Sequence, residues 1–193
     1  MQRKLSFFIL LACFVLFFQK FSLAGKLVTI ETQKAHLTLL LVKKLLLLEG
    51  NLSKHIKRHH HKYKILVIAP QTYSAFQDQR LVNETVIEFL KQDPSFQFKV
   101  ARSSKEALRL IKKEHFDLLY IAGITPNLER IIHLAHQKRI ITVSHLTELV
   151  YKGVAISLDL DRAEACILAN ERTWKLFNLT LPEKLVKKIC FVR

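Results

Sequence analysis

The sequence predicts an α/β fold of three layers, in which a Rossmann-like, mostly parallel sheet ends in an antiparallel C-terminal hairpin at its edge. Two patterns predict this fold. From Lys64 onward, short apolar runs rich in β-branched residues alternate with longer segments of helical period, as in parallel βαβ units. Near the C-terminus, two apolar runs flank Asp161 and Arg162, which is typical of a hairpin. A chain of 193 residues can close one sizeable core but not two.

Each strand and helix has a local signal. The strands are expected at residues 65–69, 96–100, 118–122 and 140–143, followed by hairpin strands at 154–160 and 163–168. Apolar stripes of helical spacing lie between the strands, at Val82, Val86, Phe89 and Leu90, then at Ala107, Leu108 and Ile111, then at Leu128, Ile131, Ile132 and Ala135. Ser103 with Glu106, and Thr180 with Glu183, form capping boxes. The second box opens a closing helix with the stripe Leu181, Leu185 and Ile189.

Composition excludes several classes of protein. Half of the residues are apolar and 24% are charged, with 4 Gly and 4 Pro, which argues against a disordered or collagen-like chain. Three cysteines without a Cys-x-x-Cys pair exclude a disulfide scaffold, a zinc ribbon and a thioredoxin-type centre. The formal net charge is +15, so we expect a partner that is acidic or anionic.

Residues 1–24 have the three parts of a secretory signal peptide. Arg3 and Lys4 precede a largely apolar run over residues 5–18, and small residues precede an expected cleavage between Ala24 and Gly25. The run is shorter than the roughly 20 residues of a membrane-spanning helix. An uncleaved anchor and a lipoprotein modified at Cys13 are the alternatives. Cleavage removes Arg3, Lys4 and Lys20, which lowers the net charge from +15 to +12.

The mature protein, residues 25–193, is expected to be one periplasmic domain. Residues 33–50 form its N-terminal helix, whose apolar centre at 37–48 is broken by Lys43 and Lys44 and covers one face of the sheet. Export makes nucleic acid an unexpected partner, whereas an anionic membrane surface or an acidic protein fits the charge.

A basic, histidine-rich loop follows at residues 51–64. Imidazole rings suit zinc, copper or nickel, but five cationic side chains at positions 54–64 would repel a metal ion and no carboxylate is close enough to orient the rings. We therefore expect a solvated loop and no metal. The weak candidate ligands are His55, His59, His60 and His61.

Motifs of several enzyme classes are missing. The first strand ends at Pro70 without a glycine-rich turn for a phosphate, and the third ends at Gly123 without the aspartate of a receiver domain. No nucleophile elbow and no His-Glu-x-x-His helix occurs. Ser144 and His145 end the fourth strand, where open α/β sheets bind ligands, but a helix cap and a loop histidine explain them better than catalysis. We expect neither enzymatic activity nor a cofactor.

Other residues have structural and functional readings. His115, His133 and His136 are more easily explained as scattered polar residues than as metal ligands, and Trp174 and Phe177 are expected in the core. In an oxidising compartment, Cys166 and Cys190 could form a bridge that fixes the C-terminus. Two buried free thiols are the alternative, because the sequence does not supply the Cα separation.

A set of short motifs occurs in a fixed order toward the C-terminus. A strand ends in Thr-Val-Ser, a glycine precedes the hairpin, an asparagine precedes the last helical region, and leucines recur in the terminal helix. The positions are Thr142, Val143 and Ser144, then Gly153, Asn170, Leu179 and Leu185. In this order, and over about Gln33 to Arg193, the chain resembles the YfiR/HmsC family of exported bacterial regulators.

The resemblance implies a periplasmic α/β protein, often a homodimer, without enzymatic activity. Family members restrain the periplasmic sensor region of an inner-membrane diguanylate cyclase, and stress relieves the inhibition. The sequence departs from the family pattern at the end of the first helix, residues 45–50, and at His145, where an acidic residue is usual. Cys166 and Cys190 do not form the closely spaced pair of redox-responsive members.

The leading hypothesis is therefore a periplasmic protein that binds and inhibits a membrane-bound diguanylate cyclase. The alternative is an exported solute-binding domain that uses the crevice at the carboxyl ends of the strands, near Pro70, Gly123 and Ser144. A third hypothesis is an envelope enzyme that uses Ser144 or His145. It is the least favoured, because neither residue belongs to a complete catalytic motif.

Overall fold

The computed structural model describes residues 29–47, 62–70, 77–161, 165–179 and 183–193. The strands are β1 (Tyr63–Ile68), β2 (Phe96–Ala101), β3 (Leu118–Ile121), β4 (Ile141–Ser144), β5 (Ile156–Asp159), β6 (Cys166–Asn170) and β7 (Ile189–Val192). The helices are α2 (Ile30–Leu47), α4 (Gln77–Gln92), α5 (Ser104–Lys113), α6 (Leu128–Gln137), α7 (Glu148–Tyr151), α8 (Glu171–Phe177) and α9 (Glu183–Val186). The predicted strands and the helices between them are confirmed, with ends shifted by a few residues.

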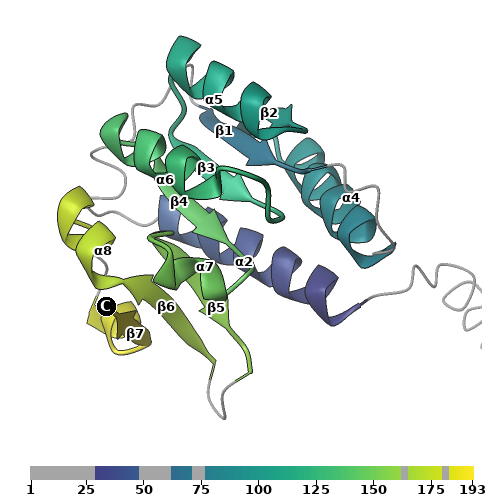
Figure 1. The fold of residues 1–193 in the computed structure, drawn as a ribbon. Coiled ribbons are helices and arrows are strands. Elements are labelled where there is room, and N and C mark those ends of the chain that lie inside the picture. Colours follow the sequence, from purple (N-terminus) through teal and green to yellow (C-terminus); the bar gives the residue numbers. More distant parts are fainter. Residues whose placement is uncertain (1–28, 48–61, 71–76, 162–164, 180–182) are drawn as a thin grey trace, which may run out of the picture.

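The seven strands form one sheet in the order β2-β1-β3-β4-β5-β6-β7 (Figure 1). The first five strands run parallel, β5 and β6 pair antiparallel, and β7 pairs parallel with β6. The predicted α/β class with an antiparallel C-terminal pair is therefore confirmed. The pair does not lie at the edge of the sheet as predicted, because β7 pairs with the outer side of β6. Because β6 and β7 are reversed, their carboxyl ends lie at the end of the sheet where β4 and β5 begin.

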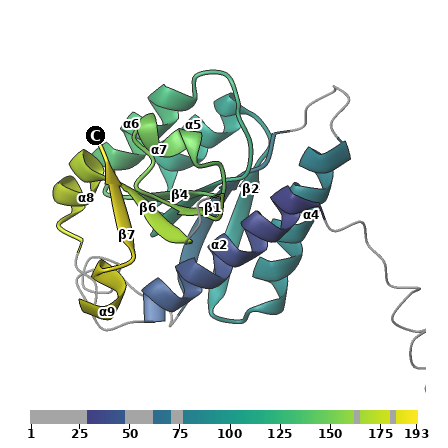
Figure 2. The ribbon, with the colours of Figure 1, turned by 90° about the horizontal axis from the view of Figure 1, so that it is seen from below.

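Helices cover both faces of the sheet, which gives the three predicted layers (Figure 2). Ile65 and Val67 of β1 belong to the core under α2 and α4, whereas Leu66 and Ile68 belong to the core under α5, α6 and α7. Successive side chains of a strand point to opposite faces, so a strand buried on both faces needs a continuous apolar run. That requirement explains the apolar sequence of β1.

The N-terminal helix begins earlier than the sequence predicts. Thr29 precedes α2, and its Oγ1 accepts a hydrogen bond from the backbone N–H of Thr32 at 3.2 Å, as a helix cap does. The inner side of α2 packs on the sheet through Ala35, Leu39, Val42, Leu45 and Leu46. Its outer side carries the exposed residues Ile30, Leu37 and Leu40.

The predicted closing helix is wrong in its extent. α9 ends at Val186, and Ile189, predicted on the stripe of that helix, lies in β7 beside Ile167. Pairing with β6 gives the backbone of this segment hydrogen bonds, and its β-branched and aromatic residues suit a strand. Thr180 and Leu181 lie outside the described residues, as does the side chain of Leu185.

Cys166 of β6 and Cys190 of β7 are joined by a disulfide, with their Cα atoms 6.1 Å apart. This separation lies in the usual range for disulfides. The bridge therefore ties the last described strand of the sheet to its neighbour.

No helix within the described ranges is long and apolar enough to cross a membrane. Two sets of residues lie outside these ranges, so the structure does not bear on the predictions made for them. They are the cleavage site at Ala24 and Gly25 and the histidines His55, His59, His60 and His61.

Candidate functional site

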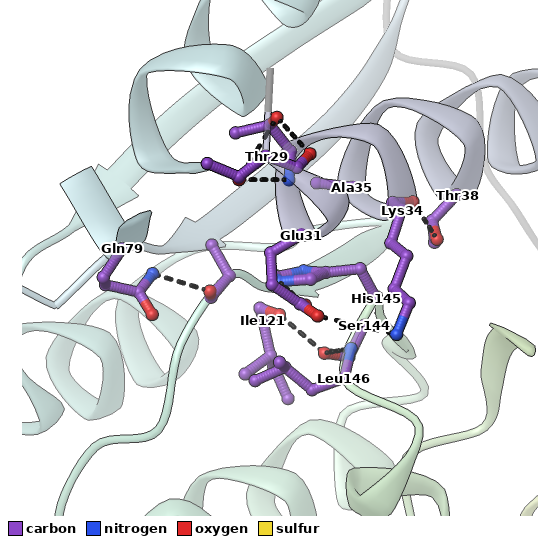
Figure 3. Close-up of polar contacts among 12 residues, drawn as sticks. Thr29, Glu31, Lys34, Ala35, Thr38, Gln79, Ile121, Ser144, His145 and Leu146 are labelled. Carbon is purple, nitrogen blue, oxygen red and sulfur yellow. Dashed lines mark hydrogen bonds and ion pairs between the residues drawn. The ribbon is translucent and has the colours of Figure 1, made fainter. Parts of the chain in front are cut away.

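At the carboxyl ends of β1 and β3, where the sequence predicts a crevice, side chains of α4 bind backbone carbonyls. Gln79 of α4 reaches the end of β3, where its Nε2 donates to the carbonyl of Ala122 at 2.8 Å (Figure 3). A Cβ on Gly123 would lie 2.9 Å from the amide group of Gln79. Asn83 Nδ2 donates to the carbonyl of Pro70 at 3.3 Å. Two amide groups of α4 thus lie against the ends of β1 and β3 and bind the carbonyls there.

Ser144 uses its hydroxyl within the framework. Its Oγ donates to the carbonyl of Ile121 at 2.8 Å and accepts the backbone N–H of Leu146 at 3.1 Å. The first bond ties the end of β4 to the end of β3, and the second shapes the turn that leads to α7 (Figure 3). The hydroxyl has both kinds of partner, which is the arrangement of a structural cap.

His145 is buried under α2. Its Nδ1 lies 3.3 Å from the hydroxyl of Tyr120, and its Nε2 lies 3.9 Å from a carboxylate oxygen of Glu31. Burial, and to a smaller extent the charge of Lys34, lowers the pKa of His145 to about 4. The ring is therefore neutral at pH 7, and its contact with Glu31 is not an ion pair. Burial also raises the pKa of the Tyr120 hydroxyl.

A chain of charges holds α2 over this position. Lys34 Nζ lies 3.5 Å from Glu31 and 2.9 Å from Asp161, which follows β5. The hydrogen bond with Asp161 raises the pKa of Lys34 against the opposing effect of burial. We call Glu31, Lys34, Tyr120 and His145 the strand-end cluster. Its polar groups contact one another between the start of α2 and the ends of β3 and β4, and Ser144 beside it binds backbone groups.

An open cleft lies at the opposite end of the sheet, between α6, α7 and α8. It has a volume of about 780 Å³, and we call it the α6–α8 cleft. Its lining combines side chains of α6, the residues between α7 and β5, α8, and the residue that follows β7. These are Glu129, Ile132, His133, His136, Tyr151, Lys152, Gly153, Asn170, Arg172, Thr173, Leu176 and Arg193.

The lining of the cleft is basic. Lys152, Arg172 and Arg193 are exposed cations, and Glu129 is the acidic residue among the lining side chains. Arg193 is paired with Glu171, whose carboxylate oxygen lies 3.2 Å from its Nε. Burial lowers the pKa of His136, and the charge of the nearby His133 lowers it further, so the His136 ring is neutral at pH 7. Chemically, Lys152 and Arg172 beside a polar cavity suit an anionic group of a ligand.

Asn170 and Gly153 form the floor of the cleft. The side chain of Asn170 donates to the carbonyl of Val150 and accepts the N–H of Thr173, both at 2.9 Å. Thr173 Oγ1 donates to the carbonyl of Gly153 at 3.0 Å. Gly153 has φ of +100°, which side chains rarely allow, so a glycine is required there. These contacts fix α7 and α8 relative to each other.

The other predicted residues are spread over the fold. His133 and His136 both line the cleft, but His115 lies at the start of β3 near Asp117. Within the described parts of the chain, no three His, Cys, Asp or Glu side chains are placed to hold a metal ion. Phe177 is buried as predicted, whereas Trp174 is only partly buried and packs edge-on against Phe191.

The cations of the cleft were not indicated by the sequence. Lys152, Arg172 and Arg193 are far apart in the chain and belong to no motif. They meet because α8 follows the reversed strand β6, and Arg193 follows β7 at the same end of the sheet. In a chain with 31 Lys and Arg residues, no local signal separates these three from the rest.

No family model matches the chain, and no curated protein sequence matches it. Among solved structures, the chain is similar to the ligand-free, open structure of a substrate binding protein with adhesive properties from Clostridium difficile. The TM-score is 0.53 and the identity 14%, over 81% of this chain and 58% of that chain. A second similar structure is the ABC domain in complex with L-Trp from Streptococcus pneumonia, with a TM-score of 0.49 and 13% identity, over 74% of this chain and 59% of that chain.

The chain therefore spans less than two thirds of the length of either similar structure. At 14% identity, the first likeness shows the fold alone. It shows that the chain has an α/β fold, and a fold does not imply a function.

Proposed function

We propose that the chain is an exported regulatory protein without enzymatic activity. It binds the periplasmic sensor region of a membrane-bound diguanylate cyclase and lowers cyclic di-GMP signalling. The observation that carries the proposal is the structural use of the residues that resemble the YfiR/HmsC pattern. Thr142 Oγ1 accepts the N–H of Ala155 at 2.9 Å, Gly153 makes the turn before β5, and Asn170 fastens α7 and α8. The ordered motifs thus hold neighbouring elements of the fold together, which supports an architecture shared with the YfiR/HmsC family.

The contacts of Ser144 and His145 support the absence of enzymatic activity. A nucleophilic serine needs a hydroxyl within reach of a base, but the hydroxyl of Ser144 binds Ile121 and Leu146. His145 is 2% exposed and lies against Tyr120. His145 lies under α2 and Ser144 is buried at the end of β4, so neither side chain is exposed to a substrate in this fold.

Charge supports an acidic partner. A mature net charge of +12 attracts an acidic protein surface and holds the protein near an anionic membrane. Association with the partner should weaken as ionic strength rises. If the association rate does not depend on the salt concentration, electrostatic attraction does not guide the protein to its partner.

Deletion of the gene in the native bacterium tests the proposed function. Cyclic di-GMP should rise, and the rise should be absent in a strain that also lacks the target cyclase. The whole chain should restore the low level, whereas a chain without residues 1–24, which stays in the cytoplasm, should not. Unchanged cyclic di-GMP under both resting and inducing conditions would overturn the proposal.

The homodimer and the periplasmic location belong to the same proposal. Cell fractionation should place the whole chain in the periplasm, and sedimentation of residues 25–193 should give twice the mass of the chain. A cytoplasmic location would contradict the regulatory role, because the chain would not meet the outer portion of the cyclase.

A second candidate function is favoured by the α6–α8 cleft. An exported solute-binding domain would use this cleft, rather than the predicted crevice near Gly123, where Gln79 binds the carbonyl of Ala122, to hold a small anionic solute. Its volume of about 780 Å³ suits a small molecule, and Arg172 is exposed at its rim. A specific solute should raise the melting temperature of the mature protein without any partner.

The solute assay has a matched control. Arg172→Ala should remove the rise in melting temperature, whereas Arg109→Ala, an exposed arginine on α5, should retain it. If no anionic solute shifts the melting temperature, this second function is excluded for the solutes screened and the regulatory proposal is unaffected.

A further inference from the structure

In the part of the chain that the structure describes, the outer edge of β7 pairs with no other strand. β7 is the last strand of the sheet (Figure 1). Ile167 N–H donates to the carbonyl of Lys188 at 2.8 Å, and Ile167 is in register with Ile189. In a parallel ladder this directs the backbone groups of Cys190 toward β6 and those of Ile189 and Phe191 away from it. The edge therefore presents alternate N–H and C=O groups.

An apolar surface accompanies this edge. The side chain of Phe191 is 50% exposed and meets Trp174 edge-on, with ring centroids 5.6 Å apart. Val186, just before the strand, is 45% exposed. A strand added beside β7 could bury these side chains while it pairs with the backbone, which combines the two sources of affinity in strand addition.

The disulfide holds β7 in a fixed position for pairing with a further strand. A strand of four residues at the edge of a sheet frays easily. The bond between Cys166 and Cys190 holds β7 against β6, so its outer groups stay in position. Pairing of a further strand then does not have to order β7 as well.

The charges around β7 decide which strand fits. Residues 183–193 hold one acidic residue, Glu183, and four basic residues, Lys184, Lys187, Lys188 and Arg193. Glu183 lies 3.5 Å from Lys187 and Glu171 lies 3.2 Å from Arg193, and the group remains positive with both carboxylates included. In a symmetric antiparallel pair with a second copy, the register centred on Cys190 places Lys187 of each copy opposite Arg193 of the other. Like charges directly opposite destabilise a ladder. The edge therefore disfavours a second copy and favours an acidic segment.

We infer that the outer edge of β7 binds an extended, acidic segment of a partner protein, which adds to the sheet as a further strand. The inference rests on the proposed function for the identity of the partner, a segment in the outer portion of the cyclase. The backbone pairing and the charge preference belong to β7 itself and can be tested without the cyclase.

Hydrogen exchange gives the first test. The probe is a short peptide of alternating glutamate and valine, added to the mature protein, and a lysine-valine peptide is the control. The acidic peptide should slow exchange at the amides of Ile189 and Phe191, while Cys190 is already protected by β6. Equal protection by both peptides, or none at Ile189 and Phe191, would overturn the inference. Protection that grows with protein concentration alone would also overturn it, because a second copy would then be the partner.

Substitutions separate backbone pairing from side-chain contact. Phe191→Pro removes an outward N–H but no bond to β6, whereas Phe191→Ala removes the ring and keeps the N–H. The proline variant should bind the acidic peptide about tenfold more weakly than the alanine variant, since it lacks a backbone donor. An equal loss in both would contradict strand addition. Melting curves confirm that each variant is folded.

A charge-reversal variant tests the preference for an acidic peptide independently of Phe191→Pro. Lys187→Glu with Lys188→Glu should lose the acidic peptide and gain the lysine-valine peptide. The matched control is Lys112→Glu with Lys113→Glu, which makes the same change of net charge on α5. If both double variants lose the acidic peptide equally, the preference comes from the overall charge and not from β7.

Complementation in cells distinguishes this inference from the proposed function. If deletion of the gene raises cyclic di-GMP but Phe191→Pro restores the low level as well as the wild-type chain does, the edge is not the cyclase site and the inference fails. If deletion changes nothing while the acidic peptide still protects Ile189 and Phe191, the proposed function fails and the acidic strand site stands for another partner.

Discussion

At the carboxyl ends of β1, β3 and β4, polar side chains are numerous but have partners within the fold. Gln79 and Ser144 bind backbone carbonyls, and His145 lies against Tyr120 under the start of α2 (Figure 3). At the opposite end of the sheet, Lys152 and Arg172 are exposed around an open cleft. The number of polar groups is therefore a poor guide to a site, because what matters is whether those groups are already satisfied.

The direction of β6 and β7 explains why the α6–α8 cleft lies at the end of the sheet where the sequence predicted no site. Ligands of open α/β sheets bind outside the carboxyl ends of the strands. β6 and β7 run opposite to β1–β5, so the carboxyl ends of these two strands lie next to the start of β5. Asn170 and Arg193, which end or follow them, consequently line the α6–α8 cleft.

Low pH should have the largest effect on the free energy of unfolding, and it acts through His145 at the carboxyl end of β4. The pKa of His145 is about 4 in the fold, because of burial and then Lys34, against an ordinary value of 6.5. Between these values the unfolded chain binds a proton that the folded chain does not. Stability from the neutral ring is therefore complete above pH 6.5 and is lost as pH falls toward 4, by about 3 kcal/mol in total. Urea unfolding across this range measures the loss.

A variant assigns this pH dependence to its group. His145→Leu cannot titrate and should flatten the profile between pH 6.5 and 4. His136 has a pKa lowered in the same direction by burial, so a smaller slope should persist in the variant. An unchanged slope in His145→Leu would show that the strand-end cluster does not exclude the proton.

Loss of Asn170 should have the next largest effect, and it acts under the open cleft. Asn170→Ala removes two buried hydrogen bonds, to Val150 and to Thr173, and should cost about 2 kcal/mol in the free energy of unfolding. Asn170→Ser keeps an acceptor for the N–H of Thr173 and should recover part of this loss. Equal stability of Asn170→Ala and the wild type would mean that the cleft floor is not held by this side chain.

A double-mutant cycle tests how the predicted crevice is filled. A Cβ at Gly123 would meet the amide of Gln79 at 2.9 Å, so Gly123→Ala should displace that side chain and its bond to Ala122. The cost is about 1 kcal/mol, the value of one hydrogen bond. In a Gln79→Ala background, the same Gly123 substitution should cost almost nothing. Additive losses would show that the two residues do not share the space.

The smallest change in stability is expected at the rim of the cleft. Arg172 is exposed, so Arg172→Ala should alter the free energy of unfolding by less than about 0.5 kcal/mol. The same variant should weaken binding of an anionic solute if the cleft holds one. A large loss of stability in thermal melting would instead make Arg172 part of the framework and remove it from the candidate site.

Much of the fold was predictable because its signals are local. The apolar run of β1, the helical stripe of Val82, Val86 and Leu90, and the cap at Ser103 each need only neighbouring residues to form. The segment at Ile189 shows where local reasoning fails. Its residues fit the apolar spacing of a short helix as well as a strand, and it forms a strand because it pairs with the outer edge of β6.

The candidate site was predictable only in part for the same reason. The sequence identified Ser144 and His145 by their place after a strand, but their partners, Tyr120 and Glu31, come from β3 and α2. Whether such a group is free or satisfied depends on which distant side chains reach it. No pattern around positions 144 and 145 contains that information.

The sequence by itself determined the alternation of strands and helices, the basic charge and the absence of known catalytic motifs. Tertiary structure decided that α2 and α4 close the carboxyl end, that Lys152, Arg172 and Arg193 meet at the other, and that β7 forms an edge bound by a disulfide. The physical reason is range: backbone propensity and periodicity act between residues a few positions apart. Satisfaction of polar groups and juxtaposition of charges depend on contacts between residues far apart in the chain.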